Sequence, residues 1–365
     1  MDFIRKITKI VLTGGPGAGK TTALSHLVER VASMGYQIFV VPEASTILHM
    51  GGAEPLKMNP GVFEDSVIKT QIILEDSMVK FANTFNNRSV VICDRGVMDS
   101  SAFIDEKAWN VVMKNNNWNI VNLRDLRYDA VIHLESSAVE VPHHYTTENN
   151  PIRIKESNIA KTIDFNLRKS WMGHPHFRLI KSREDFNEKM NDVVKSVCGF
   201  LGEPEPKEIE KKFLVKEPGL IPVEHQKVDV EQYYLKTDNN ETLRIRQRGQ
   251  DGHFVYFLTQ KKRVESGQIV ELEKQISGKE YFELLETKDE SKSVIKKTRT
   301  CFMYEGMYYE LDHITCPVNL HVLEVEIDNI NDNPVLPPFI EIIEDVTNKL
   351  EWSNFAISSM QAELF

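Results

Sequence analysis

A run of glycines near the start of the chain carries the clearest chemistry. Its residues match the spacing G-x-x-x-x-G-K-[ST]: Gly14, Gly15, Pro16, Gly17, Ala18, Gly19, Lys20 and Thr21, with Thr22 following. Glycines let backbone N–H groups turn toward phosphate oxygens, and the N-terminus of a following helix attracts anions. We expect Lys20 to contact the β- and γ-phosphates of a nucleotide and the Thr21 hydroxyl to bind Mg²⁺. Residues 14–22 therefore predict a phosphate-binding loop (P-loop) for GTP or ATP.

Charged residues end the next two predicted strands. Glu43 ends the run IFVVPE, and Asp94 and Arg95 follow VVIC. Because the carboxyl ends of parallel strands meet at one edge of a sheet, these side chains are expected near the P-loop. Asp94 is expected to bind Mg²⁺, Arg95 to contact a phosphoryl group, and Glu43 to act as a general base toward an acceptor hydroxyl. The alternative for each carboxylate is that it caps the next helix.

The residues that would recognise the nucleotide base are less evident. No N/T-K-x-D element for guanine stands out. Gln71, in a predicted helix, is a candidate, although a polar residue on a long helix more often faces solvent. The choice between adenine and guanine stays open on these residues.

In the second part of the chain, charged residues recur at every second position. A strand places such residues on one face, and apolar residues such as Leu243, Ile245 and Val325 lie between them. The basic members are Lys212, Arg244, Arg246, Arg248, Lys261, Lys297 and Arg299, and the acidic members are Glu208, Glu210, Glu271, Glu273, Glu310, Asp312, Glu324 and Glu326. A closed barrel with a charged lumen is expected, in which the cations bind phosphates and the carboxylates hold divalent cations. The alternative is a polar outer face.

The order of elements predicts two domains, residues 1–203 and residues 206–365. In the first, apolar strands alternate with helices, which is typical of an α/β parallel sheet covered on both faces. The expected strands are 7–13, 38–41, 89–93, 130–134 and 177–180, and the expected helices are 21–34, 65–84, a shorter one after Asp99, 157–172 and 183–201. A proline-containing linker is expected at 202–207. The second domain is predicted as an α+β antiparallel β-barrel that ends in an amphipathic helix at about 339–350.

Composition restricts the class of protein. The chain has 365 residues, of which 41% are hydrophobic and 27% charged, so general disorder is excluded. The net charge of -10 argues against binding nucleic acid through bulk charge. Cys93, Cys198, Cys301 and Cys316 are scattered, which favours reduced thiols over a disulfide framework. No apolar run is long enough to span a bilayer. We expect a cytoplasmic protein.

The motifs of the first domain resemble a known family. VLTGGPGAGKTT, VVPEAS, VVICDRGVMDS and a later SWMGHPHF segment are similar to the P-loop kinase-like ATPases, which include ribosylnicotinamide and deoxynucleoside kinases. The resemblance implies that Glu43 occupies the base position and that Asp94 and Arg95 form the D-R element of the family. It also implies that Arg153, with Lys155, belongs to a lid over the phosphates.

The alternating charges of the second domain resemble the CYTH or triphosphate-tunnel fold. The run EIEKK is followed in order by LRIR, T-x-K, K-x-R and a late E-x-E. The resemblance implies carboxylates on the metal side, namely Glu208, Glu210, Glu324 and Glu326. It implies cations on the phosphate side, namely Lys212, Arg244, Arg246, Lys261, Lys297 and Arg299, and Arg248 continues the same face.

The order of the two domains resembles the TRPL translocation defect protein family over the whole chain. This implies a protein that binds GTP with Mg²⁺ and recognises a phosphoinositide headgroup or another polyphosphate anion. It also implies peripheral contact with endomembranes or the plasma membrane and a role in vesicular trafficking of membrane proteins. Two rival classes stay open: a regulatory binding module, and a metal-dependent enzyme that is either a small-molecule kinase or a triphosphatase.

Overall fold

The structure is a computed structural model that describes residues 7–140, 151–202, 210–237, 241–263, 269–327 and 332–360. The chain divides into two compact units at residues 204 and 205. Most of the predicted linker, and Glu208, lie outside the described residues. The first unit holds the P-loop sequence, and the second holds the alternating charges.

The first unit is built on a parallel sheet of five strands. They are β1 (Ile7–Thr13), β2 (Gln37–Val41), β3 (Ser89–Asp94), β4 (Ala130–Leu134) and β5 (Phe177–Ile180), in the order β2–β3–β1–β4–β5. The predicted strands are confirmed to within one residue. From β1 the chain crosses to one side for β2 and β3 and to the other side for β4 and β5. Ligands of open α/β sheets bind at the carboxyl ends of the strands beside such a reversal, and the P-loop follows β1 there.

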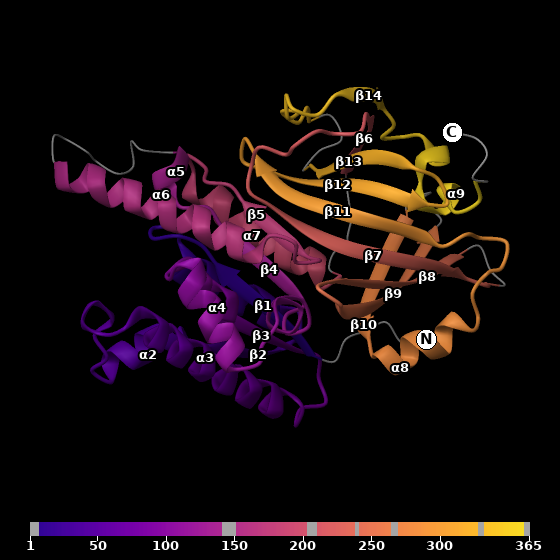
Figure 1. Cartoon of the computed structure of the whole chain (residues 1–365). Helices are drawn as coiled ribbons and strands as arrows, with labels where there is room; N and C mark the ends of the chain where they lie inside the picture. The colour runs from indigo at the N-terminus through magenta and orange to yellow at the C-terminus, as the bar shows by residue number, and fades with distance from the viewer. Residues whose placement is uncertain are drawn as a thin grey trace. The chain divides into compact units, whose positions relative to one another are not determined.

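The helices of this unit connect successive strands, except the last helix, which follows β5 (Figure 1). They are α1 (Lys20–Ser33), α2 (Ala44–Met50), α3 (Pro60–Ala82), α4 (Glu106–Asn115), α5 (Ser137–Glu140), α6 (Pro151–Trp171) and α7 (Phe186–Phe200), with shorter helical turns η1 (Pro55–Lys57), η2 (Val97–Ala102) and η3 (Val121–Asp125). Ile10 and Leu12 of β1 pack with Leu27 of α1 and Val193 of α7. Val11, which points to the opposite face of the sheet, is equally buried, so both faces are covered.

The second unit is an antiparallel sheet with the strand order β10–β9–β8–β7–β11–β12–β13–β6–β14. Its strands are β6 (Glu210–Val215), β7 (His225–Leu235), β8 (Glu241–Gln250), β9 (His253–Arg263), β10 (Ile269–Ile276), β11 (Ile295–Tyr304), β12 (Met307–Cys316), β13 (Leu320–Glu326) and β14 (Ile342–Asp345). It also contains α8 (Gly278–Leu285), η4 (Leu350–Trp352) and α9 (Asn354–Ile357). The first strand of the unit, β6, is inserted between β13 and β14, which come near the end of the chain.

The predicted amphipathic helix at 339–350 is wrong. That segment contains β14, which pairs with β6 from Ile342 to Asp345. A strand has backbone N–H and C=O groups on both of its edges, and β14 supplies the second partner of β6. Helix α8 is not predicted, because the alternation of charged and apolar residues in this domain indicates strands. Ser277 and Glu280 nevertheless form a capping box at its N-terminus.

The two faces of this sheet differ in chemistry. One face carries apolar clusters, with Phe213, Leu311 and Leu323 among their buried residues. The other face, called the tunnel face below, carries the alternating charges Glu210, Lys212, Arg244, Arg246, Arg248, Lys261, Glu271, Glu273, Lys297, Arg299, Glu310, Asp312 and Glu324. The sheet is strongly curved (Figure 1). None of the described helices is both long and apolar enough to cross a bilayer.

An electrostatic contact shows how far the sheet curves. Glu210 on β6 and Lys261 on β9 lie toward opposite ends of the strand order. Burial and Glu324 raise the pKa of Glu210, and the positive charges of Lys212 and Lys261 act against this rise. The Glu210 side chain is nevertheless 44% exposed to water. Both observations follow if the tunnel face encloses a space that water enters and that these strands face from different sides.

Candidate functional site

The glycine-rich loop has the backbone of a phosphate cradle. Gly14, Gly17 and Gly19 adopt φ values of 145°, 73° and 87°, which residues with side chains rarely adopt. A Cβ atom on Gly14 would lie 2.2 Å from the carbonyl oxygen of Leu134. Helix α1 begins directly after the loop at Lys20, so its first N–H groups point toward the cradle.

Lys20 lies across this loop. Its Nζ donates a hydrogen bond to the carbonyl oxygen of Gly14 at 3.1 Å. Burial and the positive charge of Arg95 lower the pKa of Lys20, and Asp94 acts in the opposite direction. The structure thus brings the predicted lysine, the D-R element and the glycine loop together, while Thr21 and Thr22 are exposed at the start of α1.

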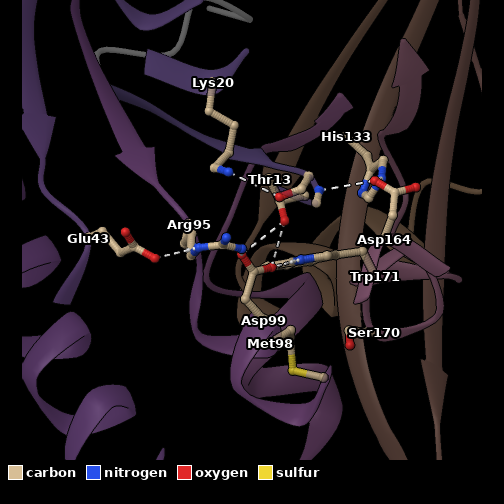
Figure 2. Close-up of polar contacts among 12 residues, drawn as sticks. Thr13, Lys20, Glu43, Arg95, Met98, Asp99, His133, Asp164, Ser170 and Trp171 are labelled. Atoms are coloured by element: carbon tan, nitrogen blue, oxygen red, sulfur yellow. Dashed lines mark hydrogen bonds and ion pairs between the residues drawn. The ribbon is translucent and has the colours of Figure 1, made fainter. Parts of the chain in front are cut away.

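Arg95 is held between two carboxylates at the carboxyl edge of the sheet (Figure 2). Its Nε donates to Glu43 Oε1 at 2.6 Å and its Nη1 donates to Asp99 Oδ2 at 3.2 Å. Asp99 also accepts hydrogen bonds from Thr13 Oγ1 at 2.9 Å and from the indole of Trp171 at 2.5 Å. The sequence gives no sign of this role for Asp99, because its partners come from distant elements. Arg95 has φ of 70°, a strained value for a residue other than glycine.

Glu43 keeps its charge in this arrangement. Burial opposes its ionisation, but Arg95 and the hydroxyl of Thr46 outweigh burial and lower the pKa of Glu43. Its side chain makes no capping hydrogen bond to the N-terminus of α2, so the capping alternative is wrong for this residue. An ionised carboxylate beside the P-loop can accept a hydrogen bond or a proton from an acceptor hydroxyl.

Asp94 has the features of a metal ligand. Its Oδ1 is buried without a hydrogen-bond partner, and burial raises the pKa of Asp94 against the effect of Lys20. Mg²⁺ is bound in such sites through one or two carboxylates together with substrate phosphates, so Asp94 and the Thr21 hydroxyl fit it. In the described part of the chain, no group of three or more His, Cys, Asp or Glu side chains is arranged to hold a metal ion.

The role of Asp94 leads to a first prediction. Asp94→Asn is expected to reduce the gain in nucleotide affinity that Mg²⁺ provides by at least about tenfold, because a neutral amide oxygen is a weaker ligand than a carboxylate. The measurement is calorimetric titration with nucleotide, with and without Mg²⁺, and Glu188→Gln on the surface of α7 is the control. If the variant shows the same difference in nucleotide affinity with and without Mg²⁺ as wild type, Asp94 has a structural role and does not bind the metal.

The sequence does not reveal the buried carboxylate that anchors the P-loop. Asp164 of α6 accepts hydrogen bonds at Oδ1 from the N–H groups of Gly15 and Ser136, both at 3.0 Å. The Nε2 of His133 lies 3.1 Å from the same oxygen (Figure 2). Arg168 lies 2.8 Å from Oδ2. A Cβ atom on Gly15 would come within 2.9 Å of the Asp164 side chain, so the second glycine permits this approach. Helix α6 is therefore tied directly to the loop.

Gln71, the candidate for recognition of the base, contacts the backbone of the protein instead. It is only 3% exposed, so it does not face solvent. Its Oε1 accepts from the N–H of Ala44 at 3.3 Å, and its Nε2 donates to the carbonyl oxygen of Arg95 at 3.0 Å. Gln71 therefore holds in place the backbone of Ala44, which follows Glu43, and that of Arg95, and both ends of its amide are used. The side chain of Arg153, the predicted lid residue, lies outside the described residues.

On the tunnel face, one group of charges lies on β6, β11, β12 and β13. Lys212 lies 2.8 Å from Glu324 and 3.3 Å from Glu210. Arg299 lies 2.7 Å from Asp312 and 2.8 Å from Glu324. The remaining pairs of this group are Lys297 with Asp312 and Arg299 with Glu310.

A second group lies on β8, β9 and β10. Arg244 lies 2.8 Å from Glu271, and Arg246 lies 2.9 Å from Glu273. Lys261 also pairs with Glu271, at 2.5 Å. Arg248 shares their face of β8 but makes no ion pair within the described ranges.

These pairs change the expected division of the tunnel face into an acidic side and a basic side. Glu210 and Glu324 are predicted metal-side carboxylates, but both of them form an ion pair with Lys212. Burial opposes the ionisation of Glu324, but Lys212 and Arg299 outweigh it and lower the pKa of this carboxyl well below its usual range. Glu326 is exposed and lies opposite Glu210 in the register of β13 and β6. Glu210 and Glu324 each lie beside a cation as well, which reduces the cost of burying these charges.

Comparisons with known proteins divide the chain in the same way. Residues 9–189 match the family model of the AAA domain, and residues 206–356 match that of the CYTH domain. No curated protein matches the chain.

Three solved structures similar to this chain each cover less than half of it. An inorganic triphosphatase, NE1496, is 29% identical over 43% of this chain and 97% of its own length, with a TM-score of 0.33. A second structure of NE1496, described as a hypothetical protein, is 31% identical over 42% of this chain and 99% of its own, with a TM-score of 0.32. A putative adenylate cyclase from Bacillus halodurans is 19% identical over 34% of this chain and 81% of its own, with a TM-score of 0.27.

Proposed function

We propose that this chain, which joins an AAA domain of the P-loop type to a CYTH domain, binds a nucleoside triphosphate with Mg²⁺ in the first and a polyphosphorylated anion in the second. The observation that carries the proposal is the gathering of basic side chains on the tunnel face, from Lys212 on β6 to Arg244 and Arg246 on β8 and Arg299 on β11. Guanidinium groups match phosphate oxygens in geometry and charge. A bound polyanion would exchange water for several charge-assisted hydrogen bonds.

In the first domain, the backbone N–H groups of the P-loop and Lys20 bind the phosphates. Arg95, fixed by Glu43 and Asp99, lies where it can contact a phosphoryl group. Mg²⁺, held by Asp94 and Thr21, would neutralise part of the phosphate charge. The nucleotide state then biases the second domain, which makes the protein a regulator.

The finer assignments rest on the resemblance of the whole chain to the TRPL translocation defect protein family. They are GTP as the nucleotide, a phosphoinositide headgroup as the anion, and a role in the vesicular trafficking of membrane proteins. The protein would then be cytoplasmic and bind the membrane surface through the headgroup. With a net charge of -10, it would be repelled by anionic lipid in general, so recognition has to come from the tunnel face.

A metal-dependent enzyme is the second candidate. Glu43, ionised beside the P-loop, fits the base of a small-molecule kinase. Glu210 and Glu326, opposite each other and accessible, fit carboxylates that bind a metal for a triphosphatase.

The second prediction tests the tunnel face with vesicles. Wild-type protein is expected to sediment with vesicles that contain phosphoinositide and not with vesicles that contain phosphatidylserine at equal charge. The double variant Arg246→Gln/Glu273→Gln removes both members of the Arg246–Glu273 ion pair, while Arg244, which also lies 4.0 Å from Glu273, keeps its pair with Glu271. The variant is expected to lose about tenfold or more of this binding. Lys279→Gln on the exposed surface of α8 is the control.

The outcomes separate the candidates. Equal binding to both kinds of vesicle, or unchanged binding by the double variant, contradicts the phosphoinositide proposal. Release of phosphate from tripolyphosphate with Mg²⁺ or Mn²⁺ at roughly one per second or faster favours the triphosphatase. Transfer of phosphate to a nucleoside acceptor that Glu43→Gln abolishes favours the kinase.

A further inference from the structure

Arg248 differs from the other cations of the tunnel face. It follows Arg244 and Arg246 at every second position of β8, and it is only 2% exposed. Its Nη1 is buried without a hydrogen-bond partner. In the part of the chain that the structure describes, no carboxylate forms an ion pair with it, whereas Arg244 and Arg246 contact Glu271 and Glu273.

The groups around Arg248 do not supply the missing negative charge. Val230 and Val255 flank it in the registers of β7 and β9. Its charge acts on Cys301 and Tyr308, but burial raises the pKa of Cys301 to about 11 and raises that of Tyr308 well above its usual value. Both groups are therefore neutral at physiological pH.

Glu310, an acidic group that acts on the same two residues as Arg248, is already engaged. Glu310 acts on the same Cys301 and Tyr308, but it forms its ion pair with Arg299. A guanidinium group carries a positive charge, so burial of Arg248 is burial of a charge. An unpaired charge in such a place destabilises the fold, and a bound anion removes that cost.

We propose that Arg248 forms a separate phosphate subsite at the end of the arginine row of β8. This subsite rests on the proposed function of the tunnel face and determines which anions the tunnel face prefers. Positions 244 and 248 of a strand lie about 13 Å apart, so a ligand that uses the whole row carries phosphates at well-separated points. The ligand class is thus a multiply phosphorylated anion longer than pyrophosphate, either a linear polyphosphate or a polyphosphorylated headgroup.

The position of Arg248 in this row also distinguishes it from its neighbours. Arg244 and Arg246 exchange a carboxylate for a phosphate when an anion binds. Arg248 has no carboxylate to give up among the described residues, so a phosphate that reaches it gains the full interaction. Arg248 therefore contributes to affinity only for anions that extend far enough to reach it.

The test is calorimetric titration of the full chain in a Lys20→Ala background, so that the P-loop does not take up the anion. The probes are pyrophosphate, tripolyphosphate, a longer linear polyphosphate and a soluble inositol polyphosphate. Arg248→Met is expected to weaken the binding of the longest anion that binds wild type by tenfold or more, and that of pyrophosphate by less than threefold. Arg248→Lys, which keeps the charge, is expected to restore part of the loss. The linear and inositol arms distinguish a soluble polyphosphate from a headgroup.

Thermal denaturation without anion gives an independent readout. Arg248→Met removes an unpaired buried charge, so its midpoint is expected to equal or exceed that of the parent. The matched control Arg246→Met breaks the 2.9 Å ion pair with Glu273 and is expected to lower the midpoint by several degrees.

Each result has one meaning. If the parent binds none of the probes, the proposed function of the tunnel face fails, and the inference fails with it. If the parent binds and Arg248→Met binds every probe equally well, the subsite is overturned while the proposed function stands. A midpoint for Arg248→Met that falls as far as that of Arg246→Met, or a failure to fold, also overturns it, because Arg248 then has a structural partner.

Discussion

Replacement of Lys20 by alanine is expected to weaken the binding of a nucleoside triphosphate about 10- to 100-fold. The lysine Nζ lies over the glycine loop, 3.1 Å from the carbonyl oxygen of Gly14, where a phosphate would be bound. A charge-assisted hydrogen bond to phosphate contributes roughly 1.5–3 kcal/mol, which corresponds to that loss of affinity. The measurement is calorimetric titration with GTP and with ATP in the presence of Mg²⁺.

Two comparisons make the result specific. Lys80→Ala, at the exposed end of α3, removes the same charge from the same unit and is expected to change affinity less than twofold. Circular dichroism of Lys20→Ala should match wild type, since Lys20 makes one hydrogen bond to the loop and is not part of the apolar core. Unchanged nucleotide affinity in a folded Lys20→Ala protein would refute the P-loop assignment.

Asp164→Ala is expected to produce the largest loss of stability in the first unit, about 3 kcal/mol. The carboxylate is fully buried and accepts from Gly15 and Ser136 while contacting His133 and Arg168. Its removal leaves buried donors without an acceptor and the partly buried Arg168 with one fewer counter-charge. Urea denaturation of the full chain measures this loss. Asp164→Asn, which keeps an oxygen in place of Oδ1, is expected to cost about half as much.

Asp164 also makes the stability of the first unit depend on pH. Burial opposes the ionisation of Asp164, but His133 and Arg168 outweigh it, and the pKa falls from 3.8 to about 2. Since the folded state lowers this pKa, the stability that Asp164 provides is complete above pH 3.8 and is lost as the pH falls toward 2. Asp164→Asn should therefore reduce the decline of stability between these two pH values. If the loss of stability in this pH range is the same in Asp164→Asn, other carboxylates cause it.

The parts of the fold that follow from local sequence could be predicted. The strands of the first unit are short apolar runs rich in β-branched residues, and glycine spacing alone defines the P-loop. In the second unit, alternation at period two correctly places Arg244, Arg246 and Arg248 on one face. Ser277 and Glu280 also contain a local signal for α8, the capping box, which an alternation-based interpretation overlooks.

The parts that depend on distant pairing could not be predicted. Gly15 and Asp164 are far apart in the sequence, and nothing in either segment indicates that one holds the other. The β14 segment has a helix-like pattern of apolar and charged residues, but the open edge of β6 decides its conformation. The pairing of each tunnel carboxylate with a cation likewise depends on register between strands such as β6 and β13, in which Lys212 faces Glu324.

The place of β6 in its sheet has a consequence for how the chain is made. Synthesis delivers β6 first among the strands of its unit, yet both of its neighbours, β13 and β14, are delivered near the end. Pairing across such a sequence distance is slow, and β6 has two unpaired edges until it occurs. The first unit, in contrast, contains all its strands before β6 emerges from the ribosome. A nascent chain interrupted before Leu320 would therefore carry β6 without either of its partners and be prone to aggregation, so translation of β13 and β14 is required to complete the sheet around β6.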